Sequence, residues 1–129
     1  MNPEFLKLDD VLEIHRLQLT RYGGLSGIRD QGLLESALAQ PMAAFDGEFV
    51  HANPFGMAAA YLFHIVKNHA FVDGNKRTGL LAALVFLDIN GVVIDHSSEI
   101  LYDLTMAVAE GRIGKEEVAA SLHQIADIA

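Results

Sequence analysis

Hydrophobic and polar positions alternate with the period of an α-helix along most of this chain. The first periodic segment is predicted to begin at a cap formed by Asp9 or Asp10 and to run to Tyr22. Its apolar positions lie mostly on one stripe and are Val11, Leu12, Ile14, Leu17 and Leu19. Gly23 and Gly24 are expected to end this helix, because glycine readily adopts the left-handed conformation found just beyond helix ends.

A second, shorter helix is predicted to follow Asp30, its cap, and to stop at Pro41, because proline interrupts a helix. Gly27 is expected to extend a flexible turn between the two helices. Residues 42–52 have no clean period, and within them Asp46-Gly47 is a turn signal that precedes a short extended piece. We therefore expect a surface loop or flap over residues 42–52.

Two strongly apolar segments occupy the middle of the chain. Asn53-Pro54 predicts a helix start, and the residues from 55 to 67 are apolar almost all round, which is typical of a central buried helix. A second apolar helix is predicted from Asn75 to Ile89 and closes at Asn90-Gly91. The polar loop 69–74 joins the two helices, so a rigid scaffold should hold it.

The C-terminal third is predicted to add two more helices. Val92-Val93-Ile94 is either a strand fragment or an extended connector, and Ser97 or Ser98 is predicted to cap a helix that reaches Glu110. An amphipathic helix is expected over residues 115–128. The pattern thus predicts an all-α fold, a compact bundle of about six helices that forms a single domain over the whole chain.

Composition and charge exclude several classes of function. The 129 residues carry 9 Lys and Arg against 17 Asp and Glu, a formal net charge of −8, which argues against direct nucleic acid binding and against an anionic membrane surface. No cysteine is present, which excludes disulfides and thiolate zinc sites. The longest apolar run, Gly79 to Leu87, is too short to span a bilayer, and the start of the chain lacks a secretory pattern. We expect a cytoplasmic protein.

Candidate chemistry is concentrated between His69 and Arg77. Lys67, Lys76 and Arg77 lie beside the amino end of the predicted second apolar helix, where free N–H groups and the helix dipole favour anions, phosphates above all. Gly74 allows a tight turn and close approach of a ligand to the backbone, and Asn75 offers a side-chain amide donor. Arg77 has a guanidinium fork that matches phosphate oxygens.

Two further residues complete a set of groups suited to phosphoryl or nucleotidyl transfer. Asp73 precedes the phosphate-binding positions, and a carboxylate beside a polyphosphate is a natural Mg²⁺ ligand. His69 has an imidazole that can take a proton from a hydroxyl near neutral pH. Base, metal ligand and phosphate-binding groups are the parts that such a reaction needs, since positioning and charge neutralisation do most of the catalysis.

Plainer interpretations of the same residues stay open. A histidine at a helix end is often a structural residue, a Gly-Asn pair is often only a turn, and an exposed arginine is often only solvated. His64 is expected to be a core histidine with a hydrogen-bond partner. The remaining histidines, His15, His51, His96 and His123, are scattered and form no zinc pattern. His51 is the one expected near the site, because the 42–52 flap is placed to position a substrate.

The stretch His69-Ala70-Phe71-Val72-Asp73-Gly74-Asn75-Lys76-Arg77 resembles the Fic/Doc signature, His-x-Phe-x-Asp/Glu-Ala/Gly-Asn-Gly/Lys-Arg. It is most similar to the Doc (death-on-curing) branch, in which lysine stands where Fic enzymes carry glycine; here that lysine is Lys76. Similarity to this branch extends over most of the chain, in the stretches 22–24, 33–38, 86–91 and 107–111. Phe71 is expected to point inward and anchor the loop.

The resemblance implies an α-helical Fic/Doc fold and a role for each residue of the signature. His69 is the general base for a target-protein hydroxyl, Asp73 holds Mg²⁺, Gly74 and Asn75 form the anion hole, and Lys76 with Arg77 binds ATP phosphates. In Doc toxins the ATP lies reversed, so that the γ-phosphate is transferred to a Thr of elongation factor Tu and translation stops. The implied partner is a Phd-type antitoxin, the other half of a type II toxin–antitoxin system.

Two departures from the wider family bear on the reaction. Fic AMP-transferases often carry a second arginine three residues after the first, where this chain has Leu80. A built-in inhibitory Ser/Thr-x-x-x-Glu pattern is absent, because the nearest match, Thr105 to Glu110, has one residue too many. These departures favour γ-phosphate transfer and inhibition by a separate partner. AMP transfer to a protein hydroxyl and a non-catalytic, partner-binding member of the fold remain the alternatives.

Overall fold

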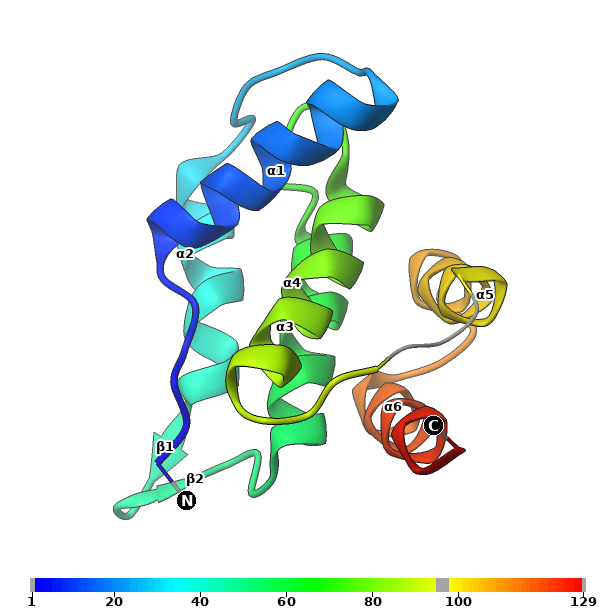
Figure 1. Ribbon diagram of the computed structural model, residues 1–129. Helices are drawn as coiled ribbons and strands as arrows, with labels where there is room; N and C mark the ends of the chain where they lie inside the picture. The colour runs from blue at the N-terminus through cyan, green and yellow to red at the C-terminus, as the bar shows by residue number, and fades with distance from the viewer. Residues whose placement is uncertain (1, 95–97, 129) are drawn as a thin grey trace.

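Two central helices, α3 (Pro54–Asn68) and α4 (Asn75–Ile89), pack against each other along their length (Figure 1). The computed structural model describes residues 2–94 and 98–128. The predicted bounds of the second apolar helix are confirmed at both ends, and the loop that joins the two helices is the polar segment singled out above.

A glycine allows these two helices to approach each other closely. A Cβ atom on Gly79 of α4 would lie 2.9 Å from Val66 Cγ2 and 3.2 Å from the carbonyl oxygen of Leu62, both on α3. The second of these atoms belongs to the backbone and has no rotamer with which to move away. The separation of α3 and α4 therefore depends on the missing side chain at this position.

Side-chain caps begin two helices where the sequence predicts them. The Asn53 side chain accepts a hydrogen bond from the Gly56 N–H at 3.0 Å at the start of α3. The Asp30 side chain accepts one from the Leu33 N–H, also at 3.0 Å, at the start of α2 (Gln31–Ala39). Each bond satisfies an N–H group that has no partner within its own helix.

The predicted cap of the first helix is wrong. The helix α1 (Leu8–Tyr22) begins earlier than expected, with Lys7 as its N-cap residue. Asp10 then stands third in the helix, and its Oδ2 accepts a hydrogen bond from the Lys7 N–H at 2.8 Å. The carboxylate thus stabilises the helix start from inside the first turn, as the acidic member of a capping box does.

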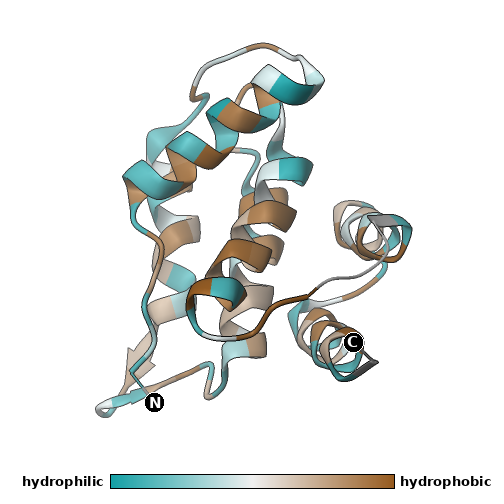
Figure 2. Ribbon diagram, in the orientation of Figure 1, coloured by the Kyte–Doolittle hydropathy of each residue, from teal (hydrophilic) through white to brown (hydrophobic). Residues whose placement is uncertain are grey.

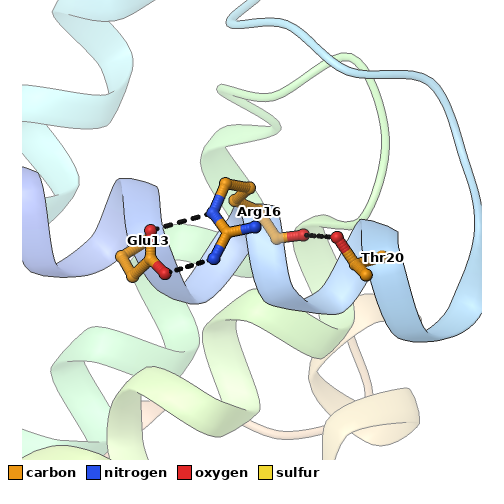
Figure 3. Close-up of polar contacts among 3 residues, drawn as sticks. All are labelled: Glu13, Arg16 and Thr20. Atoms are coloured by element: carbon orange, nitrogen blue, oxygen red, sulfur yellow. Dashed lines mark hydrogen bonds and ion pairs between the residues drawn. The ribbon is translucent and has the colours of Figure 1, made fainter.

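The exposed face of α1 carries polar pairs one turn apart (Figure 3). Arg16 donates from its Nε to the Glu13 carboxylate at 3.0 Å, and the Thr20 hydroxyl donates to the Arg16 carbonyl, also at 3.0 Å. Such exposed pairs contribute only a few tenths of a kcal/mol each, roughly, to helix stability. The buried face of α1 holds Val11, Ile14, His15 and Gln18.

The region after α2 is a short hairpin. The α2 helix stops before Pro41, and a single turn of 3₁₀ helix, η1 (Gln40–Met42), follows. The strands β1 (Ala44–Phe45) and β2 (Glu48–Phe49) pair antiparallel around the predicted Asp46-Gly47 turn. The hairpin lies at the opposite end of the molecule from the α3–α4 loop (Figure 1).

The helices α5 (Ser98–Ala109) and α6 (Lys115–Ile128) cover the other side of the central pair. Because α5 begins at Ser98, its predicted cap Ser97 lies outside the described residues. The segment 92–94 forms no strand and is the extended connector that the sequence analysis allowed.

The predicted all-α class is confirmed: six α-helices and one two-stranded hairpin make up the described part of the chain. In Figure 2, α1 alternates between polar and apolar colours, whereas α4 is largely apolar between its first and last turns. Large side chains with under 2% exposure, such as Tyr61, Met57 and Phe86, form the core around α3 and α4. No helix among residues 2–94 and 98–128 has the length and apolar character required to cross a membrane.

Candidate functional site

The site begins where α3 ends, at His69. This residue adopts the left-handed conformation (φ 49°, ψ 45°), and its side chain is exposed rather than packed along the helix. Arg29 donates from its Nε to the His69 carbonyl at 2.7 Å and from Nη2 to the Asn68 carbonyl at 3.3 Å. A side chain remote in sequence therefore occupies the carbonyls at the end of the helix and holds the histidine in its turn.

The loop after His69 pairs with the connection between α1 and α2. The Val72 N–H donates to the Gly27 carbonyl at 3.0 Å, and the Arg29 N–H donates to the Ala70 carbonyl at 2.7 Å. These bonds attach the turn around Gly27 to the loop. Backbone bonds of this kind involve no particular side chain, so the sequence pattern does not reveal them.

Phe71 points into the core, as predicted, and its side chain is buried. Its ring stacks on the imidazole of His15 with the ring centres 3.8 Å apart and the planes 9° from parallel. His15 is itself buried on α1, and its Nε2 lies 2.8 Å from the Asp73 carbonyl oxygen. The loop is thus anchored to α1 at two neighbouring points.

Asn75 closes the loop on itself. Its Oδ1 accepts a hydrogen bond from the Phe71 N–H, and its Nδ2 donates to the Phe71 carbonyl, both at 3.0 Å. One N–H of this amide is therefore engaged with the backbone of the loop, and the other remains as the predicted anion donor. Asn75 also offers its backbone N–H at the start of α4.

Asp73 is exposed, yet two backbone groups orient its carboxylate. Oδ1 accepts from the Gly74 N–H at 3.0 Å, and Oδ2 accepts from the Leu25 N–H at 3.2 Å. A Cβ on Gly24 would lie 2.9 Å from that same Oδ2, so a residue without a side chain is needed opposite the carboxylate. The carboxylate is held in one orientation before any ligand binds.

This donor set fits a magnesium ion shared with a polyphosphate. Across the described residues, no three histidine or acidic side chains gather closely enough to hold a metal by themselves. Mg²⁺ usually takes one or two carboxylates and completes its shell with water and substrate phosphates. The one exposed, oriented carboxylate of Asp73 beside the start of α4 matches that mode of binding.

The start of α4 supplies the positive part of the site. Gly74 has φ 80° and lets the chain enter the helix from a left-handed conformation. Lys76 and Arg77 follow in the first turn, both exposed, so their charges add to the positive pole of the helix dipole. The guanidinium carbon of Arg77 lies 4.1 Å from the centre of the Tyr22 ring, a cation–π contact that restrains the side chain.

All six residues predicted from the sequence line one cavity of about 400 Å³. They are His69, Asp73, Gly74, Asn75, Lys76 and Arg77. The rest of the lining comes from Val72 of the loop, from Leu80 of α4 and from Tyr102, Thr105 and Met106 of α5. Sequence reasoning missed the α5 wall, because only the packing of α5 brings it beside the loop. The volume lies in the range of small-molecule sites, roughly 300–1,000 Å³.

A second, more apolar groove adjoins this cavity between α1, α4 and α5. Its volume is about 470 Å³, and it shares Arg77, Leu80 and Tyr102 with the cavity. The residues that belong to the groove alone are Gln18, Tyr22, Leu81, Leu84 and Glu99. A molecule seated in this groove would therefore reach the phosphate-binding side of the cavity.

The expectation that His51 lies near the site is wrong. His51 packs against Gly56 at the first turn of α3, whereas His69 follows its last turn. The axis of a 15-residue helix is about 22 Å long, and the two histidines stand at its two ends. The predicted flap is the hairpin at the far end of the molecule.

His64 is a partly buried histidine with a hydrogen-bond partner, as predicted. Lys115 Nζ lies 2.9 Å from its Nε2. Burial, with a smaller effect from the nearby charges of Lys115 and His51, lowers the pKa of His64 to about 4. The imidazole is therefore neutral near pH 7 and accepts the bond from the lysine.

Comparisons with known proteins agree with this geometry. The Fic/DOC family matches residues 5–87, which include the whole loop and all but the last two residues of α4. The chain is 37% identical over 117 residues to "Protein kinase doc" of Escherichia phage P1, with 91% of each chain covered. It is 39% identical over 121 residues to "Toxin Doc" of Mycolicibacterium smegmatis, covering 92% of this chain and 91% of that one.

Proposed function

Because the chain belongs to the Fic/DOC family, we propose that it is a Doc-like toxin that transfers the γ-phosphate of ATP to a Ser or Thr hydroxyl of a translation factor. The resemblance points to elongation factor Tu as the target, which would place the activity in the cytoplasm. The observation that supports this most is the convergence of the six signature residues on one cavity.

His69 is the general base of the proposed reaction. As the hydroxyl oxygen of the target attacks the γ-phosphorus, its proton moves to the imidazole of His69. The bond between the γ-phosphorus and the β–γ bridging oxygen breaks, so that ADP leaves with the electron pair and the target carries the phosphate ester. The exposed, left-handed position of His69 leaves its ring accessible to a protein substrate from outside.

The amino end of α4 binds the phosphates. The backbone N–H of Asn75, together with the Lys76 and Arg77 cations, opposes the negative charge of the nucleotide, and Gly74 lets the phosphates approach the backbone closely. Asp73 would hold Mg²⁺, which when bound supplies charge neutralisation on the phosphates. The chain's own contribution is to keep these groups in position before the nucleotide arrives.

Two side chains of the cavity favour γ-phosphate transfer over AMP transfer. Lys76 adds a long cation where AMP-transferring relatives of the signature have glycine, and this changes which phosphates fit beside α4. Leu80 lines the cavity with an apolar side chain, one turn after Arg77, where such enzymes often carry a second arginine. A position without charge at Leu80 leaves fewer phosphate contacts on that side.

Label transfer tests the proposal directly. Purified protein is incubated with elongation factor Tu and ATP that carries label at either the α- or the γ-phosphate. We expect label from the γ position alone, and a loss of about 100-fold or more in rate for His69→Ala, because removing a general base costs that much. Label from the α position would support AMP transfer. No label in either experiment would support a binding module.

Two further variants test the assigned roles. Lys76→Gly should slow γ-phosphate transfer strongly, and near-normal transfer would refute the role of the lysine. Asp73→Ala should abolish the Mg²⁺-dependent activity; activity that persists in excess chelator would count against the metal assignment. Both residues are exposed, so circular dichroism should report an unchanged fold in each variant.

The apolar groove beside the cavity is the surface we assign to a Phd-type antitoxin. An apolar helix or segment seated there would lie against Leu81 and Leu84 and would cover Arg77. A Leu84→Glu variant should lose most of its affinity for the antitoxin and keep its transfer activity, because Leu84 does not line the cavity. Unchanged affinity in calorimetry would refute this assignment.

A further inference from the structure

The buried histidine of α1 has no role in the proposed reaction, yet it is attached to the loop at two points. The His15 ring stacks on Phe71, and its Nε2 lies 2.8 Å from the Asp73 carbonyl oxygen. The residue is buried, with 6% of its surface exposed. A Cβ on Gly74 would lie 3.5 Å from its Nε2 and Cδ2, in ordinary van der Waals contact.

We propose that His15 is a positioning residue that sets the direction of the Asp73 carboxylate and of the first N–H groups of α4. The proposal rests on the proposed function, because it assigns His15 to the same site. His15 lies beneath the loop and does not line the cavity, so it acts through Asp73 and not on the nucleotide.

The hydrogen bond determines the form of the imidazole. A backbone carbonyl only accepts, so His15 must carry a proton on Nε2 to bond the Asp73 carbonyl. The bond lies on the backbone of the same residue whose side chain is oriented by Leu25 and Gly74. If the carbonyl rotates, the peptide between Asp73 and Gly74 rotates with it, because that unit is planar. The Gly74 N–H that holds Oδ1 would then leave its present direction.

Two substitutions test separately the stacking of the His15 ring and the hydrogen bond that its N–H donates. His15→Phe keeps a flat ring to stack on Phe71 and removes the N–H, so that the Asp73 carbonyl loses its partner. His15→Gln removes the ring and places an amide N–H near the position of Nε2. A residue that only fills space would be replaced better by phenylalanine, whereas a positioning donor would be replaced better by glutamine.

Three measurements follow on the full-length chain. Nitrogen-resolved NMR of the parent protein should show a proton on Nε2 of His15. Amide hydrogen exchange should be about tenfold faster at Val72 and Leu25 in His15→Phe, and near the parent rate in His15→Gln, with the amides of α3 unchanged in both. The Mg²⁺ concentration for half-maximal transfer should rise about tenfold in His15→Phe and recover in His15→Gln.

The outcomes distinguish this inference from the proposed function. A ring without a proton on Nε2, unchanged loop exchange, an unchanged Mg²⁺ requirement, or a glutamine variant as impaired as the phenylalanine variant would each overturn the role of His15. If the parent protein transfers no phosphate but loop exchange responds as described, the proposed function fails and the positioning of the loop by His15 stands. If neither variant folds, the NMR assignment of the parent protein decides.

Discussion

Replacing Asn75 by alanine should destabilise the protein even when no nucleotide is present. The side chain makes two hydrogen bonds of 3.0 Å to the backbone of Phe71, one through each of its polar atoms. In the alternative, where Asn75 serves only as a donor to a bound anion, its removal would leave the free protein unaffected. Stability in the absence of ligand therefore discriminates between the two roles.

The expected size of the effect follows from the two bonds. Each contributes about 1 kcal/mol net, and because alanine leaves the partly buried Phe71 N–H and carbonyl unpaired, their loss costs about 2–3 kcal/mol. Alanine recovers less than about 0.7 kcal/mol through helix propensity, so the net loss is about 2 kcal/mol. For 129 residues the unfolding entropy near 60 °C is about 0.27 kcal/mol per kelvin, which converts that loss to about 7 °C in Tm.

Far-ultraviolet circular dichroism during heating measures this shift, and since the chain has no tryptophan it is preferable to intrinsic fluorescence. Lys76→Ala is the matched control: the neighbouring side chain is exposed, and its removal should change stability by less than about 0.5 kcal/mol. A Tm for Asn75→Ala within about 2 °C of the parent protein would refute the closure of the loop by this amide.

Three other predictions concern packing, a cation–π contact and pH. Gly79→Ala should lower the free energy of unfolding by about 1 kcal/mol, because overpacking against α3 outweighs the gain in helix propensity. At the exposed position Gly32, the same substitution should raise the free energy of unfolding by about 0.5–1 kcal/mol, and urea unfolding compares the two variants. Tyr22→Leu should weaken ATP binding by about two- to fivefold, because it removes the ring that restrains Arg77. Calorimetry measures the ATP affinity, and Tyr22→Phe, which keeps a ring, should bind ATP about as tightly as the parent protein. The free energy of unfolding should fall as the pH is lowered from about 6.5 towards 4, because His64 takes up a proton in the unfolded chain but, with its lowered pKa, stays unprotonated in the folded protein. His64→Gln should flatten this decline.

Elements whose ends depend on short-range interactions were predicted well from the sequence. The caps at Asp30 and Asn53 bond to N–H groups three residues away, and the bounds of α4 follow from a continuous apolar pattern between Gly74 and Asn90. The cap of α1 was misplaced, because Asp9 and Asp10 suit a cap position and also suit the first turn of a helix that is capped at Lys7.

The hairpin and the surroundings of the site were not predictable in this way. The α5 wall of the cavity depends on how α5 packs, whereas the separation of His51 from the loop follows from the length of α3, which lies between them in the chain. Arg29 and His15 reach the loop across 40 and 58 residues of chain, respectively. No local pattern marks either contact.

The amino-acid order alone therefore determined the helices, the polar loop between two buried ones, and the kinds of chemical group that the loop carries. Tertiary packing alone decided which of those groups face a common cavity, that the Asn75 amide serves the loop, and which distant side chains hold the loop in shape. The reason is physical: caps and helical periods depend on neighbours within a turn or two, whereas a site forms from groups whose separation is set only when distant helices meet.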